Sequence, residues 1–414
     1  MIKDVAEDRV ENIINKLVSF HTRHTLSTQN STTRGIGAAR DWIYKEMQAS
    51  AEPSEGRTKV YFNSYIQDVD GSRILFPVNI TNVVAQIDGT DDSNRLYVVT
   101  GHYDSRALDA LDYESYAPGA DDDASSVAVV MEMARICATK KPKATMIFAA
   151  VAGEEQGLYG SANLAKTLKQ ANLNVAGNWN NDIVGTRKGQ PFAPINDYTI
   201  RLFGASIFYP NASTSTLQRS IARIGGWNDS PAQNLGRYIA EIAAGAAKYV
   251  GMQVKLIYRP DRFTEALEDF THQHQDPRVQ DGHQYGDLIE YVDFDYTARV
   301  AKVNLASMWS AANAPAAPTN VTIITEIGSG ASSLDEPLDL SSNDSLFSWN
   351  ASNDTLTASH ELVWRSSGAL QWTHQLAVDG SSVRVPLSKD NYQFGVRAVG
   401  KDGRKSPAVF PLPA

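Results

Sequence analysis

The strongest constraint on the fold is a change of pattern along the chain. In roughly the first 310 residues, short apolar runs typical of buried strands alternate with stretches whose apolar residues recur at helical spacing. This alternation predicts an α/β domain with a mixed, largely parallel central sheet that is flanked by helices. The apolar fraction of 42% and the charged fraction of 21% are typical of an ordinary globular protein.

The elements of this domain can be placed by their periodicity. Helices are predicted at 5–20, 36–47, 124–136 and 158–169, and strands at 60–65, 82–87, 95–101 and 144–151. A further helix is expected to start near Pro231. The run at 144–151 is short and apolar except for Thr145, which favours a strand that is buried on both faces of the sheet.

A second pattern begins after a linker rich in proline and alanine. We assign residues 1–312 to the α/β domain, 313–319 to the linker and 320–414 to a small all-β sandwich. The last segment has short β-rich runs at 321–325, 346–349, 360–364, 383–386 and 393–399. Polar turns separate these runs, and no helical periodicity remains, so a β-sandwich is expected.

Charge and cysteine content exclude several classes of protein. The formal net charge of −9 argues against nucleic-acid binding, and no apolar run reaches the length of about 18 residues that a membrane span needs. The single cysteine, Cys137, cannot form an internal disulfide and is expected to be a buried structural residue. The polar N-terminus lacks the apolar core of a secretion signal, whereas eight Asn-x-Ser/Thr sequons favour an extracytoplasmic protein whose leader is absent from this chain. A cytoplasmic location stays open.

Four short motifs with acidic or histidine residues follow a predicted strand or open a predicted helix. They are GHYDS at 101–105, GADDDAS at 119–125, GEEQG at 153–157 and NDIVG at 181–185, and FTHQHQD follows at 270–276. In α/β sheets, side chains at the carboxyl ends of the strands meet at one edge. Carboxylates crowded there would repel one another unless cations were bound, so the sequence predicts a metal site.

The types of side chain indicate which metal and which chemistry. Imidazole and carboxylate ligands suit zinc, with manganese and cobalt as open alternatives. Two Zn²⁺ ions would be neutralised by three carboxylates and a bridging hydroxide, with neutral histidines. One glutamate would remain to move a proton, which is the composition of a two-metal hydrolase.

The motifs, in this order and at this spacing, resemble peptidase family M28, the di-zinc aminopeptidases of leucyl or bacterial type. The resemblance covers residues 5–312. The segment from Pro315 onward resembles a fibronectin type III-like module, on the basis of Trp349, Trp364, Tyr392 and the closing sequence VRAV at 396–399. The family resemblance implies hydrolysis of the N-terminal residue from peptides that have a free N-terminus.

The resemblance also implies a role for each site residue. In the family pattern, one zinc is held by His102 and Asp182, the other by Glu155 and His272, and Asp122 bridges the two. Glu154 would be the general base and acid, and Asp104 would orient the imidazole of His102. His272 is preferred as the last ligand because it lies four residues before Asp276, and His274 is its rival.

One departure from the family pattern keeps other functions open. M28 enzymes carry an Asp-His segment and a buried strand before the last histidine ligand, whereas here residues 257–262 run directly into 263–269. One alternative is therefore a catalytically impaired, M28-like binding protein. Another is a single-zinc enzyme similar to glutaminyl cyclases or carboxypeptidases. The C-terminal sandwich is a candidate for binding a partner or a surface, and the preferred N-terminal residue and the oligomeric state stay open.

Overall fold

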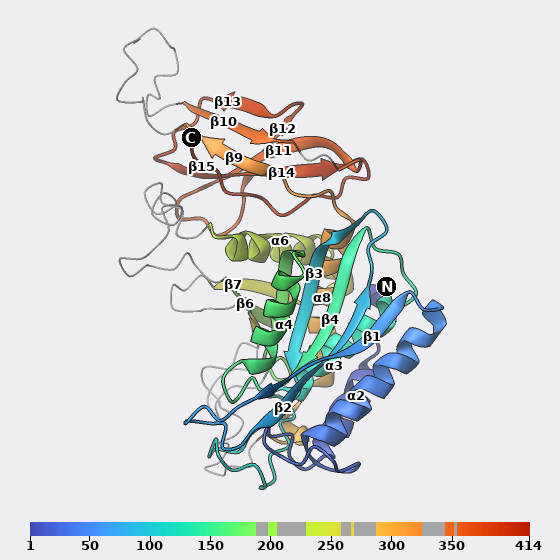
Figure 1. Cartoon of the computed structure of the whole chain (residues 1–414). Coiled ribbons are helices and arrows are strands. Elements are labelled where there is room, and N and C mark those ends of the chain that lie inside the picture. Colours follow the sequence, from blue (N-terminus) through green and yellow to red (C-terminus); the bar gives the residue numbers. More distant parts are fainter. Residues whose placement is uncertain (188–197, 205–228, 258–265, 269–286, 325–343, 352–353) are drawn as a thin grey trace. The chain divides into compact units, whose positions relative to one another are not determined.

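The computed structural model describes residues 1–414 except 188–197, 205–228, 258–265, 269–286, 325–343 and 352–353 (Figure 1). The chain forms two compact units, which are described separately. The first comprises Met1–Leu202, Ala243–Lys255 and Ala266–Ala312, and the second comprises Phe203–Ile242, Leu256–Glu265 and Asn313–Ala414. None of the helices in the described ranges has the length and apolar character that a membrane crossing requires.

The described part of the first unit is built on an eight-stranded sheet in the order β1-β2-β4-β3-β5-β8-β6-β7. The strands are β1 (Thr58–Gln67), β2 (Val78–Ile87), β3 (Asp92–His102), β4 (Ala144–Val151), β5 (Asn174–Asn181), β6 (Thr199–Phe203), β7 (Gln253–Ile257) and β8 (Ala266–Glu268). β3 pairs in parallel with β4 and β5, and β5 with β8, whereas β2 is antiparallel to β1 and β4. The predicted fold class is confirmed.

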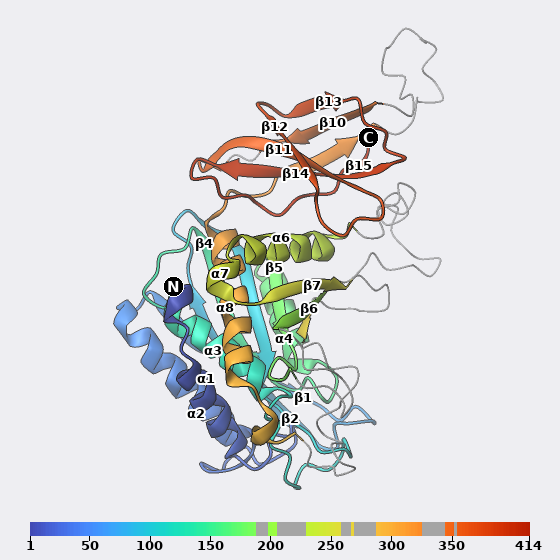
Figure 2. The same ribbon diagram turned by 180° about the vertical axis from the view of Figure 1, so that it is seen from behind.

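Helices cover both faces of this sheet (Figures 1 and 2). The helix α4 packs Leu164 and Leu168 onto one face, against Val84, Val98 and Ile147. The opposite face carries α3, which contacts β3 and β4, and α2, which contacts β1 and β2. The helices in the described residues are α1 (Glu7–Val18), α2 (Gly35–Ala51), α3 (Ala124–Cys137), α4 (Tyr159–Gln170), α6 (Pro231–Gly245), α7 (Ala247–Val250) and α8 (Phe294–Asn313), with short 3-10 turns at Ile2–Asp4, Glu52–Ser54 and Ile289–Tyr291.

The contact between α3 and the end of β3 positions the candidate site. Asp123 caps α3 by accepting a hydrogen bond from the backbone N–H of Ser126 at 3.2 Å. A Cβ atom on Gly101 would lie 2.6 Å from the Cβ of Ser126, so only glycine allows this close approach of strand and helix. At the other end of α3, Cys137 is buried as expected, and burial raises the pKa of its thiol to about 12.

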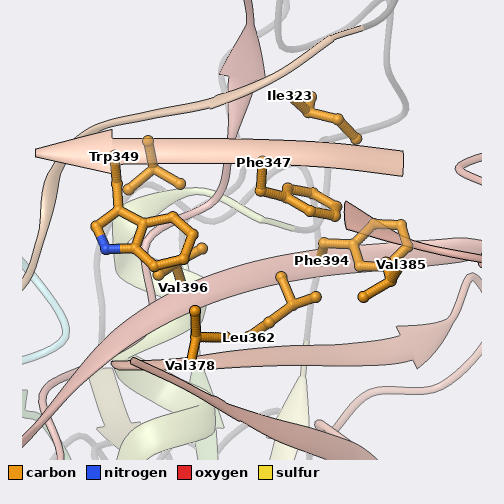
Figure 3. Close-up of a cluster of buried hydrophobic side chains, with 9 residues drawn as sticks. Ile323, Phe347, Trp349, Leu362, Val378, Val385, Phe394 and Val396 are labelled. Carbon is orange, nitrogen blue, oxygen red and sulfur yellow. The ribbon is translucent and has the colours of Figure 1, made fainter. Parts of the chain in front are cut away.

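The second unit contains two small sheets that share one core. The strands of the first sheet, in order, are β13 (Ser382–Val385), β10 (Ser345–Asn350), β9 (Thr319–Ile323) and β15 (Leu412–Pro413), and those of the second are β12 (His374–Val378), β11 (Thr357–Ser366) and β14 (Tyr392–Gly400). Phe347 and Trp349 of the first sheet pack with Leu362 and Phe394 of the second (Figure 3). Two sheets that bury their facing side chains against each other form a β-sandwich.

The second unit also includes most of α6, although this helix precedes residue 313 in the sequence. Asp229, just before α6, lies 3.0 Å from Nη1 of Arg237 and 2.7 Å from Nη2 of Arg365 on β11. The side chains of Asp229 and Arg237 are fully buried, and that of Arg365 is 2% exposed. Arg397 of β14 makes a second ion pair with the helix, at 2.7 Å from Glu241. Buried ion pairs therefore attach α6 to the sandwich.

Replacing Asp229 by alanine should strongly destabilise the protein. The change leaves two buried guanidinium groups without their carboxylate, and such a loss typically lowers the free energy of unfolding by about 3–5 kcal/mol. The matched control is Asp344→Ala, which breaks a partly exposed ion pair with Arg384 in the same unit and should lower it by less than about 1 kcal/mol. Urea unfolding followed by tryptophan fluorescence measures both values. Equal effects of the two variants would contradict the assigned importance of the buried cluster.

Candidate metal centre

The candidate site lies where β3, β4 and β5 end and α3 begins. His102 is the last residue of β3, Glu154 and Glu155 follow β4, and Asp182 follows β5 directly. Asp122 lies just before α3, next to the capping residue. Because these three strands run in parallel as neighbours, their carboxyl ends meet at one edge of the sheet, as the sequence analysis expected.

Three of the expected ligands lie close enough to share one metal ion. Among the described residues, ligand atoms of His102, Asp122 and Asp182 all lie within 4.8 Å of one another. Nε2 of His102 is 3.1 Å from Oδ1 of Asp122 and 3.9 Å from Oδ1 of Asp182. The carboxylate of Glu154 is also near, with its Oε2 at 3.9 Å from the same nitrogen. One imidazole and two carboxylates are a donor set that suits zinc.

Asp104 holds the imidazole of His102 and connects the ends of β3 and β4. Nδ1 of His102 lies 3.1 Å from the backbone oxygen of Asp104 and 3.4 Å from its carboxylate, so Nε2 points toward the other acidic residues. The same carboxylate accepts the backbone N–H groups of Glu154 and Glu155, both at 3.2 Å, and the hydroxyl of Thr25 at 3.1 Å. A carboxylate placed in this way fixes both the position and the tautomer of a metal-binding histidine.

Among the described residues, one predicted ligand, Glu155, is not part of this group. The buried carboxylate of Glu155 lies beside the guanidinium of Arg106, with Oε2 at 3.0 Å from Nε. The guanidinium of Arg73 donates to the backbone oxygen of Glu155. His272 and its rival His274 lie outside the residues that the structure describes.

Asp123 has more contacts around the site than its role as the cap of α3 requires. Besides capping α3, its carboxylate accepts the backbone N–H of His102 at 3.0 Å and that of Ile183 at 3.3 Å. It therefore connects the end of β3, the start of α3 and the turn that follows Asp182. A run of three aspartates gives no sequence signal that distinguishes this role from that of Asp122.

The sequence analysis did not single out Asp287 and Arg23. Asp287 is buried and its carboxylate accepts the backbone N–H groups of Asp121 and Asp122. Arg23 is fully buried, and its guanidinium donates to the backbone oxygens of Tyr103 at 2.7 Å and Gly119 at 2.8 Å, as well as to that of Pro118. Arg23 acts on backbone groups, so no motif reveals it. Asp287 does have a sequence signal, because it lies four residues after His283, the same spacing that favoured His272 before Asp276.

Burial and mutual repulsion shift the titration of the acidic residues. Burial raises the pKa of Asp123 to about 8 and that of Asp287 to about 7, and the charge of Asp122 adds to both shifts. Burial, together with the charges of Asp122 and Asp123, raises the pKa of Asp182 well above its usual range. For His102, burial acts to lower the pKa, but the nearby aspartates outweigh it and raise the pKa well above its ordinary value. The site thus holds more negative charge than its surroundings compensate, and a bound cation would relieve it.

Comparisons with known proteins identify the family. The sequence model of peptidase family M28 matches residues 82–223, which include every predicted site residue except His272. A probable zinc metalloprotease of Pyrenophora teres f. teres is 52% identical over 434 aligned residues, which cover 100% of this chain and 86% of that protein. This chain belongs to peptidase family M28.

Solved structures share the fold of this M28 chain. The LapA aminopeptidase of Legionella pneumophila matches with a TM-score of 0.51 and 16% identity, over 75% of this chain and 73% of LapA. The glutaminyl cyclase of Macrostomum lignano matches with a TM-score of 0.51 and 13% identity, over 75% of this chain and 90% of the cyclase. At such low identity the likeness concerns the fold alone. Since an aminopeptidase and a cyclase both use it, the fold does not determine the reaction of this M28 chain.

The metal-free M28 chain should lose stability as the pH rises. Because the pKa values of Asp123, Asp287 and His102 are raised, the folded chain binds more protons than the unfolded chain between about pH 5 and about pH 8. The free energy of unfolding should therefore fall over this interval, by an amount on the order of 3 kcal/mol. Urea unfolding in the presence of a chelator measures the slope. Zinc-saturated protein is the control, and its free energy of unfolding should fall much less, because the metal takes the place of the protons. If the free energy of unfolding of the metal-free protein rose with pH, the assigned pKa shifts would be wrong.

Proposed function

We propose that this chain is a zinc-dependent aminopeptidase that removes the N-terminal residue of peptides. The observation that carries the proposal is the convergence of His102, Asp122 and Asp182, with the carboxylate of Glu154 at 3.9 Å from the imidazole. Membership of a peptidase family supports hydrolysis of peptide bonds, and relatives described as zinc metalloproteases support the choice of metal.

We propose two zinc ions per chain. The donor set and the excess of buried negative charge fit such a centre. His102 and Asp182 would hold one ion, Glu155 and His272 the other, and Asp122 would bridge both. Zinc ions held there would supply a lower pKa for a nearby water, so that hydroxide is available near neutral pH, and positive charge to stabilise a developing oxyanion.

The protein side chains would move the proton and orient the ligands. Glu154 follows Gly153, whose φ of 72° turns the chain at the end of β4 and presents the carboxylate to the site. We infer that Glu154 takes a proton from the attacking water and gives it to the leaving amine. Asp104 would hold the imidazole of His102 in place through the turnover.

The same geometry supports the proposed preference for free N-termini. The carboxylates around His102 can accept hydrogen bonds from the amino group of a peptide N-terminus. Once the amino group lies against these carboxylates, the first peptide bond is the one within reach of Glu154. Internal peptide bonds lack such an anchor, so exopeptidase action follows.

One observation favours a second candidate, a single-zinc enzyme of the glutaminyl cyclase kind. Glu155 lies beside Arg106, and the described residues bring together ligands for one ion rather than two. A third candidate is an impaired binding protein. The alignment with the Pyrenophora teres relative extends over 434 positions, whereas this chain has 414 residues, in keeping with a chain that lacks residues its relatives have.

We also propose that residues 320–414 are a fibronectin type III-like module that binds a partner or a surface, joined by a linker at 313–319 to the peptidase domain at 1–312. Two sheets around the core of Phe347, Leu362 and Phe394 support this assignment. An extracytoplasmic location accords with such a module and with the sequons.

Metal analysis separates the three candidates. Elemental analysis of the full chain, after dialysis against trace zinc, should give two zinc ions per chain for the aminopeptidase. One ion would instead support the cyclase-like enzyme, and none would support the binding protein.

The variant Asp122→Asn should lower the content of both ions together, because the bridging residue would contact both. Unchanged metal content would mean that Asp122 is not the bridge.

Replacing Glu154 by glutamine should preserve zinc and abolish turnover. The amide keeps the size of the side chain but cannot take up the proton, and loss of a general base typically lowers kcat by about 10²–10⁴-fold. Hydrolysis of an aminoacyl chromogenic substrate measures the rate. The matched control, Glu11→Gln on the exposed surface of α1, removes the same charge and should leave kcat unchanged. A near-normal kcat for Glu154→Gln would exclude Glu154 as the base.

A further inference from the structure

We propose that Asp287 is a positioning residue of the metal centre, which fixes the backbone of residues 120–122 and thereby aims the carboxylate of Asp122 at His102 and Asp182. The inference rests on the proposed function, because it assumes that Asp122 binds metal. Asp287 lies far along the chain, 165 residues after Asp122. The residues that follow Asp287 lead into α8, and Asp287 does not belong to any of the strands that carry the candidate ligands.

Asp287 takes up the backbone N–H groups of three consecutive residues. Its Oδ1 accepts the N–H of Asp121 at 2.7 Å and its Oδ2 that of Asp122 at 2.9 Å. Its own backbone oxygen accepts the N–H of Ala120 at 3.4 Å. Hydrogen bonds to an ionised carboxylate are short and strong, and two parallel ones fix direction as well as distance. Asp287 is itself 4% exposed, so water competes little for these contacts.

The ends of this segment are already fixed by other groups. Gly119 has a φ of +54°, and a Cβ atom there would lie 2.5 Å from the backbone oxygen of Asp122, so the turn before the aspartates is tightly packed. On the other side, the carboxylate of Asp121 accepts the backbone N–H of Gly185 at 2.7 Å. A shift of residues 121 and 122 would therefore also disturb the turn that follows Asp182.

The chemistry of Asp287 points to metal binding rather than to stability alone. A second buried carboxylate close to Asp122 is unfavourable because the two charges repel each other. The buried cation of Arg23 offsets part of this repulsion. A neutral acceptor would hold the same backbone N–H groups without repelling Asp122. A carboxylate is advantageous where cations are to be bound nearby, because it adds negative charge around the ligands.

The test compares Asp287→Asn with Glu290→Gln in the full chain. Asparagine keeps the shape of the side chain but has only one oxygen that can accept a hydrogen bond. Its NH₂ group would face a backbone N–H, and two donors cannot form a hydrogen bond with each other. Zinc affinity, measured by competition with a chromophoric chelator, should fall about 10–100-fold, the usual effect of losing a group that orients ligands. The absorption spectrum of the Co²⁺-loaded protein should change as well. Glu290→Gln removes an exposed charge three residues along and should leave both readouts within about twofold of the wild type.

The outcomes separate this inference from the proposed function. If the wild type binds zinc and a folded Asp287→Asn variant has the same zinc affinity and cobalt spectrum, the positioning role is wrong and the proposed function stands. If the wild type binds no zinc, both the positioning role of Asp287 and the proposed function are wrong. If Asp287→Asn does not fold, Asp287→Glu decides: it keeps both acceptor oxygens one methylene further out, and a folded variant with unchanged zinc affinity would overturn the inference.

Discussion

The candidate site depends on the parallel pairing of β3 with β4 and β5. This pairing brings the ends of three strands to one edge and so gathers acidic residues that repel one another. Backbone dipoles stabilise the crowded charges: Asp104, Asp123 and Asp287 each accept two or three backbone N–H groups. Each of these carboxylates thereby links the segments whose backbone N–H groups it accepts. The same hydrogen bonds keep the carboxylates in position for binding a cation.

Much of this arrangement can be predicted from the sequence, because it follows from local pattern. The strand β4 has the predicted bounds, since its residues are apolar except for Thr145 and follow the charged Lys143. The helix α3 begins at the predicted residue and extends one residue beyond its predicted end. His102, Asp122 and Asp182 converge as expected, because the position of each follows from the end of a strand or the start of a helix.

Other features could not be predicted, for physical reasons that differ. The strand β5 was not predicted because its residues 174–181 include four asparagines and a glycine, and it gains its stability from pairing with β3. Asp287 was missed because the spacing of four residues between a histidine and an aspartate occurs twice, at 272/276 and at 283/287, and the first pair was chosen. The attachment of α6 to the sandwich was missed because the amphipathic pattern of a helix shows that one of its faces is buried. The pattern does not show which part of the protein covers that face.

The buried cluster of Asp229, Arg237 and Arg365 has a consequence for how the chain is synthesised. Arg365 leaves the ribosome well after the other two, so the carboxylate of Asp229 gains its second guanidinium only once β11 has been made. Until then, Asp229 can pair with Arg237, which also donates a hydrogen bond to Asn234 within α6. The attachment of α6 to the sandwich can therefore form only after β11 has been synthesised, and a ribosome stalled before β11 would expose α6 without that contact.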